Sequence, residues 1–328
     1  MLTKRENLLE TIKGGNPDRF VNQYEFMEII MEVPLVKDCF LEPGTERKNN
    51  WGIYYKWPEG HIGQMPVHGE HTVVKDITEW KKYVKAPSVK FADEDWAPAI
   101  KHANSVDRNE QFVTAPYFGG VFEMCHNLLG MENALMAFYE EPEYMHELID
   151  FITEYELAFA KEVIEHIHPD ALFHHDDWGT QRNSFMSPET FKEFYEPAYK
   201  KIYGYYKENG VELVVHHCDC YAANLVPSMI EMGIDIWQGC MTTNNPAELI
   251  KKYGGQISFM GGIDSGVVDF PEWTQEIVDR EVEKACENGK KYFIPSLTQG
   301  LNLSSFPGVY EAVSAAIDRI NKKRNLVL

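Results

Sequence analysis

The sequence predicts an α/β fold, a single (β/α)8 TIM barrel over residues 1–328 with an N-terminal insertion as a cap. Five strand–helix units follow one another between residues 170 and 323, and strands that alternate with helices form parallel sheets with right-handed crossovers. Two further strands precede them, and at least seven such units favour a closed barrel over a doubly wound sheet. No GxGxxG or GxxxxGK[ST] phosphate loop follows a predicted strand.

The predicted strands are short apolar runs bounded by turn residues. In chain order they cover 19–26, 112–117, 170–177, 211–217, 234–240, 256–262 and 291–296. The helices between them have recognisable ends. Ser187 is an N-cap with Pro188 in the first turn, and Gly210 and Gly233 each end a helix.

Residues 27–100 interrupt this alternation with a stretch rich in Trp, Pro, Gly and His. We interpret it as an insertion that caps one mouth of the barrel, where aromatic side chains in long loops suit a flat apolar ligand. A long irregular excursion over the surface is the alternative interpretation.

The composition is typical of a globular protein, with 44% hydrophobic and 25% charged residues among 328. The net charge of −20 argues against nucleic-acid or membrane partners, because phosphate groups would be repelled. No run approaches the roughly 20 apolar residues of a membrane span, and the amphipathic N-terminus does not resemble a signal peptide. We therefore expect a cytoplasmic protein whose six cysteines are reduced. A homodimer is one candidate assembly.

Polar residues gather where the predicted strands end, and in a (β/α)8 barrel the chemistry sits at the carboxyl ends of the strands. These stretches are HHDDWGTQ (174–181), HHCDC (216–220), QGC (238–240), GGID (261–264) and SLTQG (296–300). They are distant in sequence, yet this fold would bring them to one rim.

The HHCDC stretch predicts a zinc site. Side chains at i and i+2 of a strand face the same way, so we expect His216 and Cys218 to point into the barrel and His217 to point away. An imidazole and a thiolate form half of a tetrahedral zinc site, and Cys240 at the end of the next strand is the expected third ligand. Asp176, Asp177 or Cys220 would complete the set. A Cys218–Cys220 redox pair is the alternative, but it lacks the helix context of Cys-x-x-Cys.

The HHDD stretch supplies candidate catalytic residues, His174, Asp176 and Asp177. Two adjacent acids on a strand end cannot both face inward, so one is expected to act as a ligand or catalyst and the other to support it. Glu123 and His126 are weaker candidates.

Several stretches together resemble the uroporphyrinogen decarboxylase superfamily and, within it, the cobalamin-dependent methyltransferases. They are GGNPDRFV (14–21), DDWGTQRNSFMSPETFKEFYEPAYKKI (176–202), VVHHCDC (214–220), which falls at a His-x-Cys zinc motif, and GGIDSG (261–266). The resemblance covers most of the chain and is weakest over 27–100.

The chain also differs from parts of that superfamily. It lacks the Arg-Gln-Ala-Gly-Arg stretch of the decarboxylase, so we do not expect porphyrinogen decarboxylation. Ser296 stands where thiol-methylating relatives place a zinc cysteine, and Cys240 replaces one of their acidic residues. The nearest subgroup resembles the O-demethylase methyltransferases. Glu132, Glu147 and His168 match a Glu-x14-Glu-x20-His spacing of that group, which we take as kinship because they fall on helices.

The resemblance implies a corrinoid-dependent methyltransferase that cleaves a phenyl methyl ether and passes the methyl group to cob(I)alamin on a partner corrinoid protein. Zinc would act as a Lewis acid on the ether oxygen, with Asp176 or Asp177 as the nearby acid. The aromatic ring would be held by Trp51, Tyr54, Tyr117 and Phe118. The alternatives are a zinc-dependent methylcobamide:thiol methyltransferase and a non-catalytic binding barrel.

Overall fold

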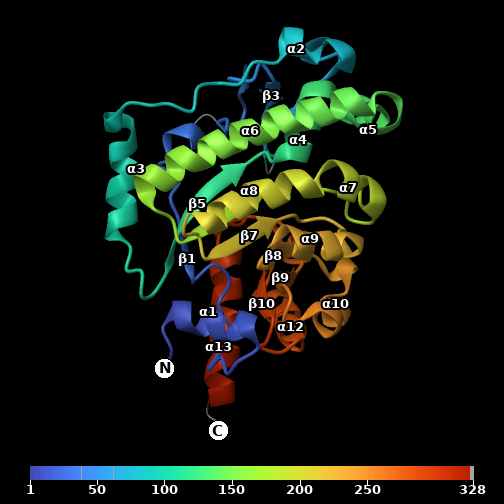
Figure 1. Ribbon diagram of the computed structural model, residues 1–328. Coiled ribbons are helices and arrows are strands. Elements are labelled where there is room, and N and C mark those ends of the chain that lie inside the picture. The colour runs from blue at the N-terminus through green and yellow to red at the C-terminus, as the bar shows by residue number, and fades with distance from the viewer. Residues whose placement is uncertain (38, 62, 326–328) are drawn as a thin grey trace.

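The computed structural model describes residues 1–37, 39–61 and 63–325. Its centre is a curled sheet of seven parallel strands in the order β1-β5-β6-β7-β8-β9-β10, wrapped by helices (Figure 1). The strands are β1 (Met27–Ile29), β5 (Phe112–Phe118), β6 (Ala171–His175), β7 (Leu213–His217), β8 (Ile236–Cys240), β9 (Ser258–Ile263) and β10 (Phe293–Leu297). Six predicted strands are confirmed to within a few residues of these bounds.

The helices follow the strands as the alternation predicts. They are α1 (Lys4–Lys13), α2 (Trp80–Tyr83), α3 (Asp93–Ser105), α4 (Val121–Leu129), α5 (Met131–Glu140), α6 (Pro142–Ile167), α7 (Pro188–Phe194), α8 (Glu196–Glu208), α9 (Val226–Met232), α10 (Pro246–Tyr253), α11 (Ser265–Val268), α12 (Gln275–Cys286) and α13 (Val309–Asn325). The Ser187 hydroxyl accepts the Thr190 N–H at 3.1 Å, which confirms the predicted N-cap. Gly233 ends α9 in the left-handed conformation, at φ 83°.

The predicted first strand, 19–26, is wrong, and the sheet has seven strands with ends at β1 and β10 in the described part of the chain, not a closed ring of eight. Residues 23–26 form a turn instead, with Gln23 at φ 50°. Phe20, Val21, Tyr24 and Phe26 are buried, so their apolar pattern reflects burial without a strand. The Gln23 side chain connects the turn before β1 to β10 and α13. Its Oε1 accepts the Leu297 N–H at 3.2 Å, and its Nε2 donates to Ser314 Oγ at 2.7 Å.

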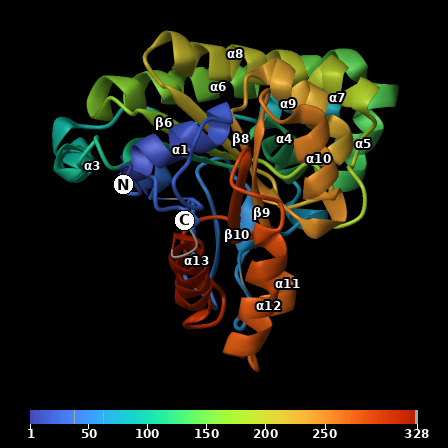
Figure 2. The same ribbon diagram turned by 90° about the horizontal axis from the view of Figure 1, so that it is seen from below.

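Two apolar layers lie on either side of the sheet. The concave face carries Phe112, Phe173, Val215, Ile236, Met260 and Ile294, and Leu8 of α1 packs with them. The convex face packs against the surrounding helices in a larger core. Viewed from below, α1 lies across the strands (Figure 2). Because both faces are covered, the central strands are apolar along nearly their whole length.

Residues 27–100 contain a small antiparallel sheet of β2 (Glu46–Lys48), β3 (Tyr54–Lys56) and β4 (Met65–Pro66). It packs on the α4–α6 side of the molecule, where Trp51 and Trp80 both contact the Phe151 ring of α6. The predicted bounds are too wide, because β1 belongs to the main sheet and α3 packs against α6. A capping role for the segment stays a prediction.

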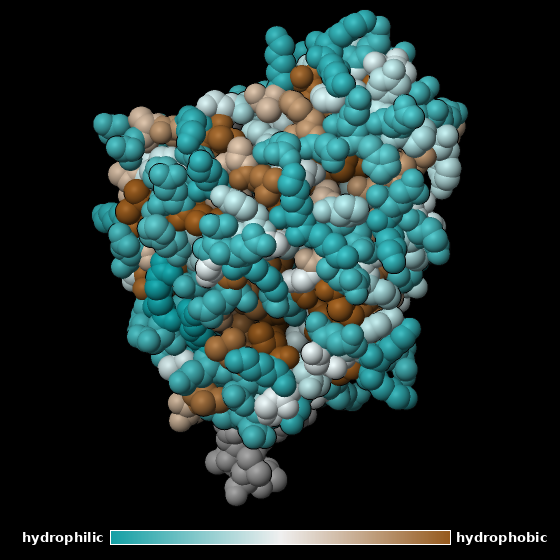
Figure 3. All heavy atoms as spheres, in the orientation of Figure 1, coloured by the Kyte–Doolittle hydropathy of each residue, from teal (hydrophilic) through white to brown (hydrophobic). Residues whose placement is uncertain are grey.

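The surface is largely polar. The face in Figure 3 is mostly hydrophilic, with hydrophobic side chains in scattered patches. Among the described helices, none combines the length and apolar character needed to cross a bilayer.

Candidate metal centre

A row of side chains crosses the concave face of the sheet at one level, close to the carboxyl ends of its strands. Strand register pairs Phe118 with His175, His175 with His217, and His217 with Gln238. Phe173 and Val215, two residues before the histidines, belong to the concave core, so the histidines face the same side. The predicted meeting of the 174–181 and 216–220 stretches at one rim is confirmed.

The predicted orientation of His216 and His217 is wrong, because the two are exchanged. The His216 ring stacks on Trp178 at 4.1 Å between centroids. Its Nε2–H donates to the Asp176 carbonyl at 3.1 Å, and its Nδ1 accepts the Tyr203 hydroxyl at 2.8 Å. It therefore lies between the sheet and α8. His217 faces the concave side instead. A period of two fixes which residues share a face, but an apolar strand buried on both faces gives no polar pattern to show which face is which.

The structure does not bring His216, Cys218 and Cys240 together. Within the described residues, the group of three with metal-ligating atoms in mutual reach is His175, Asp177 and His217. Cys218 Sγ lies 3.0 Å from Cys220 Sγ and accepts the Trp178 N–H at 3.4 Å. Burial raises the pKa of the Cys218 and Cys240 thiols, which disfavours the thiolate form in the metal-free protein.

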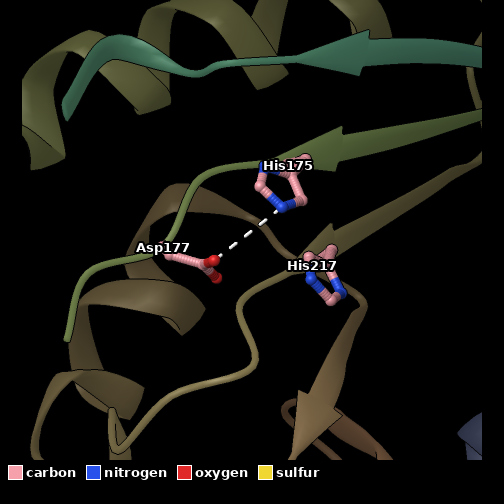
Figure 4. A group of neighbouring side chains, drawn as sticks. All are labelled: His175, Asp177 and His217. Atoms are coloured by element: carbon pink, nitrogen blue, oxygen red, sulfur yellow. Dashed lines mark ion pairs between the residues drawn. The ribbon is translucent and has the colours of Figure 1, made fainter. Parts of the chain in front are cut away.

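His175, Asp177 and His217 converge from the ends of β6 and β7 (Figure 4). Their ligand atoms all lie within 4.8 Å of one another. The two imidazoles stack at 4.6 Å between centroids, and His175 Nε2 lies 3.8 Å from Asp177 Oδ2. His217 is almost fully buried, whereas the side chains of His175 and Asp177 are 27% and 30% exposed. The group is thus closed on the β7 side and open to solvent on the other.

A second set of groups holds these three in place. Glu123 Oε2 contacts His175 Nδ1 at 3.1 Å, and the Asp219 N–H donates to Asp177 Oδ1 at 3.0 Å. His217 Nδ1 hydrogen-bonds Gln238 Oε1. Glu123 was a weaker candidate from sequence and Gln238 was not singled out. Gln238 lies two residues before the end of β8, so its place in the QGC stretch was the available signal.

The pKa values of the two imidazoles are shifted in opposite directions. Burial alone would lower the pKa of His175, but the carboxylates of Glu123 and Asp177 raise it to about 10. Burial lowers the pKa of His217 to about 4, and the neighbouring His175 adds to the effect. Burial, with the charge of Asp177, also raises the pKa of Asp219 well above its usual value. The metal-free site therefore combines a neutral imidazole, His217, with a charged one, His175, in acid-rich surroundings.

The other predicted catalytic residues, His174 and Asp176, face the helices. Asp176 caps the start of α4, accepting the N–H groups of Phe122 at 3.0 Å and Glu123 at 2.8 Å. His174 Nε2 contacts Glu156 Oε2 at 3.0 Å in the same buried layer. An added Cβ on Gly120 would lie 2.6 Å from both Asp176 Cβ and His174 Cε1, so only glycine lets α4 begin here. As predicted for adjacent acids, the two face apart, and Asp177 is the one at the rim.

Of the four aromatic residues predicted to hold a substrate ring, Phe118 alone lies beside the site. Its ring is 6.4 Å from that of His175 and meets Phe40 edge-on at 4.9 Å. Tyr117 stacks on His174 beneath the helices, Trp51 packs on Tyr155 of α6, and Tyr54 stacks on His71. Tyr117 and Phe118 are neighbours on β5 and so face opposite sides of the sheet, which is why only Phe118 reaches the concave side.

Tyr55, the neighbour of Tyr54 on β3, was missed. Its hydroxyl accepts the Asn127 side-chain N–H at 2.9 Å, and burial, with the charge of Glu123, raises its pKa. Glu132, Glu147 and His168 do not form a site. Glu147 pairs with Lys81 at 2.8 Å, and it lies roughly 30 Å along α6 from His168 at the helix end, given 1.5 Å per residue.

Comparison with known proteins identifies the family of this chain and a solved structure with a similar fold. The model of the family described as uroporphyrinogen decarboxylase (URO-D) matches residues 60–320. The chain belongs to the uroporphyrinogen decarboxylase family. A solved structure of a methyltransferase from Methanosarcina mazei is similar over 98% of this chain and 99% of that one, with a TM-score of 0.70 and 14% identity. That likeness supports the fold. No curated protein sequence matches the chain.

In this member of the uroporphyrinogen decarboxylase family, Ser296 occupies β10 beside the polar row. It pairs with Gly262 of β9, and its buried hydroxyl has no hydrogen-bond partner among the residues that the structure describes. Gly300, in the loop after β10, lies over His217, since an added Cβ would be 3.1 Å from the ring Nε2. The loop after the last strand therefore borders the site, as the barrel prediction requires.

Acid is expected to destabilise the metal-free protein. Burial lowers the folded-state pKa of His126, His174 and His217 to about 4 each and that of His216 further. Between pH 6.5 and 4 the unfolded chain then binds more protons, so stability falls as pH falls, by at most about 1.4 kcal/mol per unit for each histidine. Burial raises the pKa of Asp176 to about 7 and the pKa values of Glu156 and Asp219 well above their usual range, so these carboxyl groups offset part of this loss.

The loss should appear as a falling midpoint in urea titrations between pH 7 and 5. His175 acts in the opposite window, because its raised pKa stabilises the fold at neutral pH and that contribution is lost as pH rises towards 10. Imidazole NMR signals of the buried histidines that titrate near pH 6.5 would contradict the neutral state assigned to them.

Proposed function

We propose that this protein is a corrinoid-dependent methyltransferase, which cleaves a phenyl methyl ether and transfers the methyl group to cob(I)alamin on a partner corrinoid protein. The observation that carries the proposal is the rim group of His175, Asp177 and His217 beside the aromatic side chain of Phe118. Membership of the uroporphyrinogen decarboxylase family, and a structural neighbour named as a methyltransferase, support it.

An aryl ether oxygen is a poor leaving group, so the site must stabilise the negative charge that develops on it. Zinc, when bound by the imidazole and carboxylate groups of the rim, would supply a Lewis acid for that oxygen. Asp219 is a further carboxyl group beside the three, and burial, with the charge of Asp177, raises its pKa, so that it could hold a proton for the departing oxygen. A reduced corrinoid on the partner protein would accept the methyl group.

The chain also has side chains that suit an aromatic substrate. Phe118 and Phe40 form an edge-on pair next to His175, and Phe40 is 41% exposed. A planar ring packed against Phe118 would place its methoxy group towards the rim imidazoles. Tyr55, fixed by Asn127, lies near Glu123 on the side of the small antiparallel sheet.

The proposal is tested by incubating zinc-loaded protein with methoxylated aromatics and a reduced corrinoid protein. We expect methylcobalamin to appear in the visible spectrum with release of one phenol per methyl group. Methylation of a thiol from methylcobamide, without reaction of any ether, would select the thiol methyltransferase instead. No transfer from either class of substrate would select a non-catalytic barrel.

Phe118→Ala is expected to raise the KM for the aryl ether about tenfold, corresponding to about 1.4 kcal/mol of lost ring contact, while kcat changes little. Steady-state kinetics measure both constants. Tyr54→Ala is the matched control, because Tyr54 stacks on His71 and its ring is not among those contacting Phe118 or His175. Equal effects of the two variants would contradict the placement of the ring at Phe118.

A further inference from the structure

We propose that His175, Asp177 and His217 bind one zinc-like divalent metal ion through two imidazole nitrogens and one carboxylate oxygen, without a thiolate ligand. The inference rests on the proposed function for the chemical purpose of the metal. It does not rest on that function for its test, because metal binding is measured without turnover.

Gln238 determines which nitrogen of His217 is free. The Gln238 Nε2 donates to the Leu297 carbonyl at 3.2 Å and the Gln299 carbonyl at 3.3 Å. An amide nitrogen only donates, so the other end of the amide, Oε1, faces His217 and accepts its Nδ1–H. The Nε2 of His217 is therefore the ring nitrogen with an available lone pair, which is the form that a metal requires.

Glu123 fixes the orientation of the His175 ring by binding one of its nitrogens, which leaves the other facing Asp177. A carboxylate accepts hydrogen bonds, so Glu123 Oε2 at 3.1 Å holds the Nδ1–H of His175. The other ring nitrogen, Nε2, faces Asp177 Oδ2 at 3.8 Å. A carboxylate behind a histidine fixes the ring and increases its basicity in metal sites generally. Glu123 is itself fixed, because Asp176 accepts its backbone N–H at the start of α4.

The third side chain is oriented by the loop that follows β7. The Asp219 N–H holds Asp177 Oδ1 at 3.0 Å and leaves Oδ2 for a metal. Each of the three side chains thus has one polar atom bound to a supporting group and another turned towards its partners. Such preset orientation is what a metal site needs, and an incidental surface group has no reason to show it.

Charge and space agree with a bound cation. Glu123, Asp177 and Asp219 surround His175, so the local field attracts a divalent ion. The ligand atoms lie within 4.8 Å of one another, so small side-chain rotations would bring them to metal–ligand distances of about 2.0–2.2 Å. Three protein ligands leave at least one position for a substrate oxygen, on the side where His175 and Asp177 are exposed.

The experiment uses the full-length protein after removal of metal with a chelator. Zinc is titrated by calorimetry, and Co²⁺ is added as a spectroscopic probe. We expect one metal ion per chain and cobalt d–d bands without a sulfur-to-cobalt charge-transfer band. Asp177→Asn and His217→Gln should weaken zinc binding at least 100-fold, and Gln238→Leu roughly 10- to 100-fold. Cys218→Ser is the matched control and should bind zinc as the unaltered protein does.

Three results would overturn the inference: no zinc binding by the unaltered protein, binding unaffected by both Asp177→Asn and His217→Gln, or a thiolate charge-transfer band that Cys218→Ser removes. Circular dichroism checks folding, and the partly exposed Asp177 keeps the test valid if the buried His217 variant does not fold. Stoichiometric metal without methyl transfer from any ether would support the inference and reject the proposed function.

Discussion

Asp177→Asn is expected to lower methyl transfer roughly 100- to 1000-fold. The substitution removes the charged carboxylate oxygen that faces His175 Nε2, and with it the several kcal/mol of charge stabilisation that a metal at this position contributes. The fold should be unaffected to within about 1 kcal/mol, because the side chain is 30% exposed and Asn retains an acceptor for the Asp219 N–H.

Single-turnover transfer to a reduced corrinoid protein measures the effect, with urea denaturation as the measure of stability. The control is Cys218→Ser, which changes a side chain outside the rim group. Asp177→Asn with unaltered transfer rates would show that this carboxylate takes no part in the reaction. Loss of stability together with activity would instead indicate a structural role for Asp177.

Asp176→Ala is expected to have the reverse pattern and to cost roughly 3–5 kcal/mol of stability. Two donors at the start of α4, the Trp178 indole N–H at 3.0 Å and the Tyr199 hydroxyl would all lose their acceptor. All of these donors are buried or nearly so, and buried donors without partners carry the full desolvation cost.

Urea titration with a constant m-value measures this loss. Asp176→Asn keeps one acceptor oxygen and should lose less than Asp176→Ala. Ser187→Ala, which removes a single N-cap bond on α7, should cost only about 1 kcal/mol and calibrates the comparison. An Asp176→Ala protein within 1 kcal/mol of the unaltered chain would contradict the capping role. Substitution of Asp176 is thus expected to lower stability, whereas substitution of Asp177 is expected to lower activity.

Much of the fold follows from the sequence because its signals are local. The apolar runs that end in HHDD and HHCDC correctly predicted β6 and β7. Ser187 and Gly233 correctly predicted helix ends, because caps and turns depend on a few neighbouring residues. The first strand was misplaced because the buried residues of 19–26 pack as a turn. Only long-range contacts, such as Gln23 with Leu297, distinguish that turn from a strand.

The position of the site along the chain was determined by the sequence, since the polar stretches after β6 and β7 contain all three rim residues. The choice among their neighbours was decided by tertiary structure. His216 and His217 are equivalent in an alternating pattern, and so are Asp176 and Asp177. Because helices cover one face of these strands and the concave core the other, both faces are apolar and the sequence carries no sign of direction. Asp176 contacts α4 and His216 contacts α8, so both side chains lie on the helix-covered face of the sheet. The rim group, His175, Asp177 and His217, lies together on the concave side.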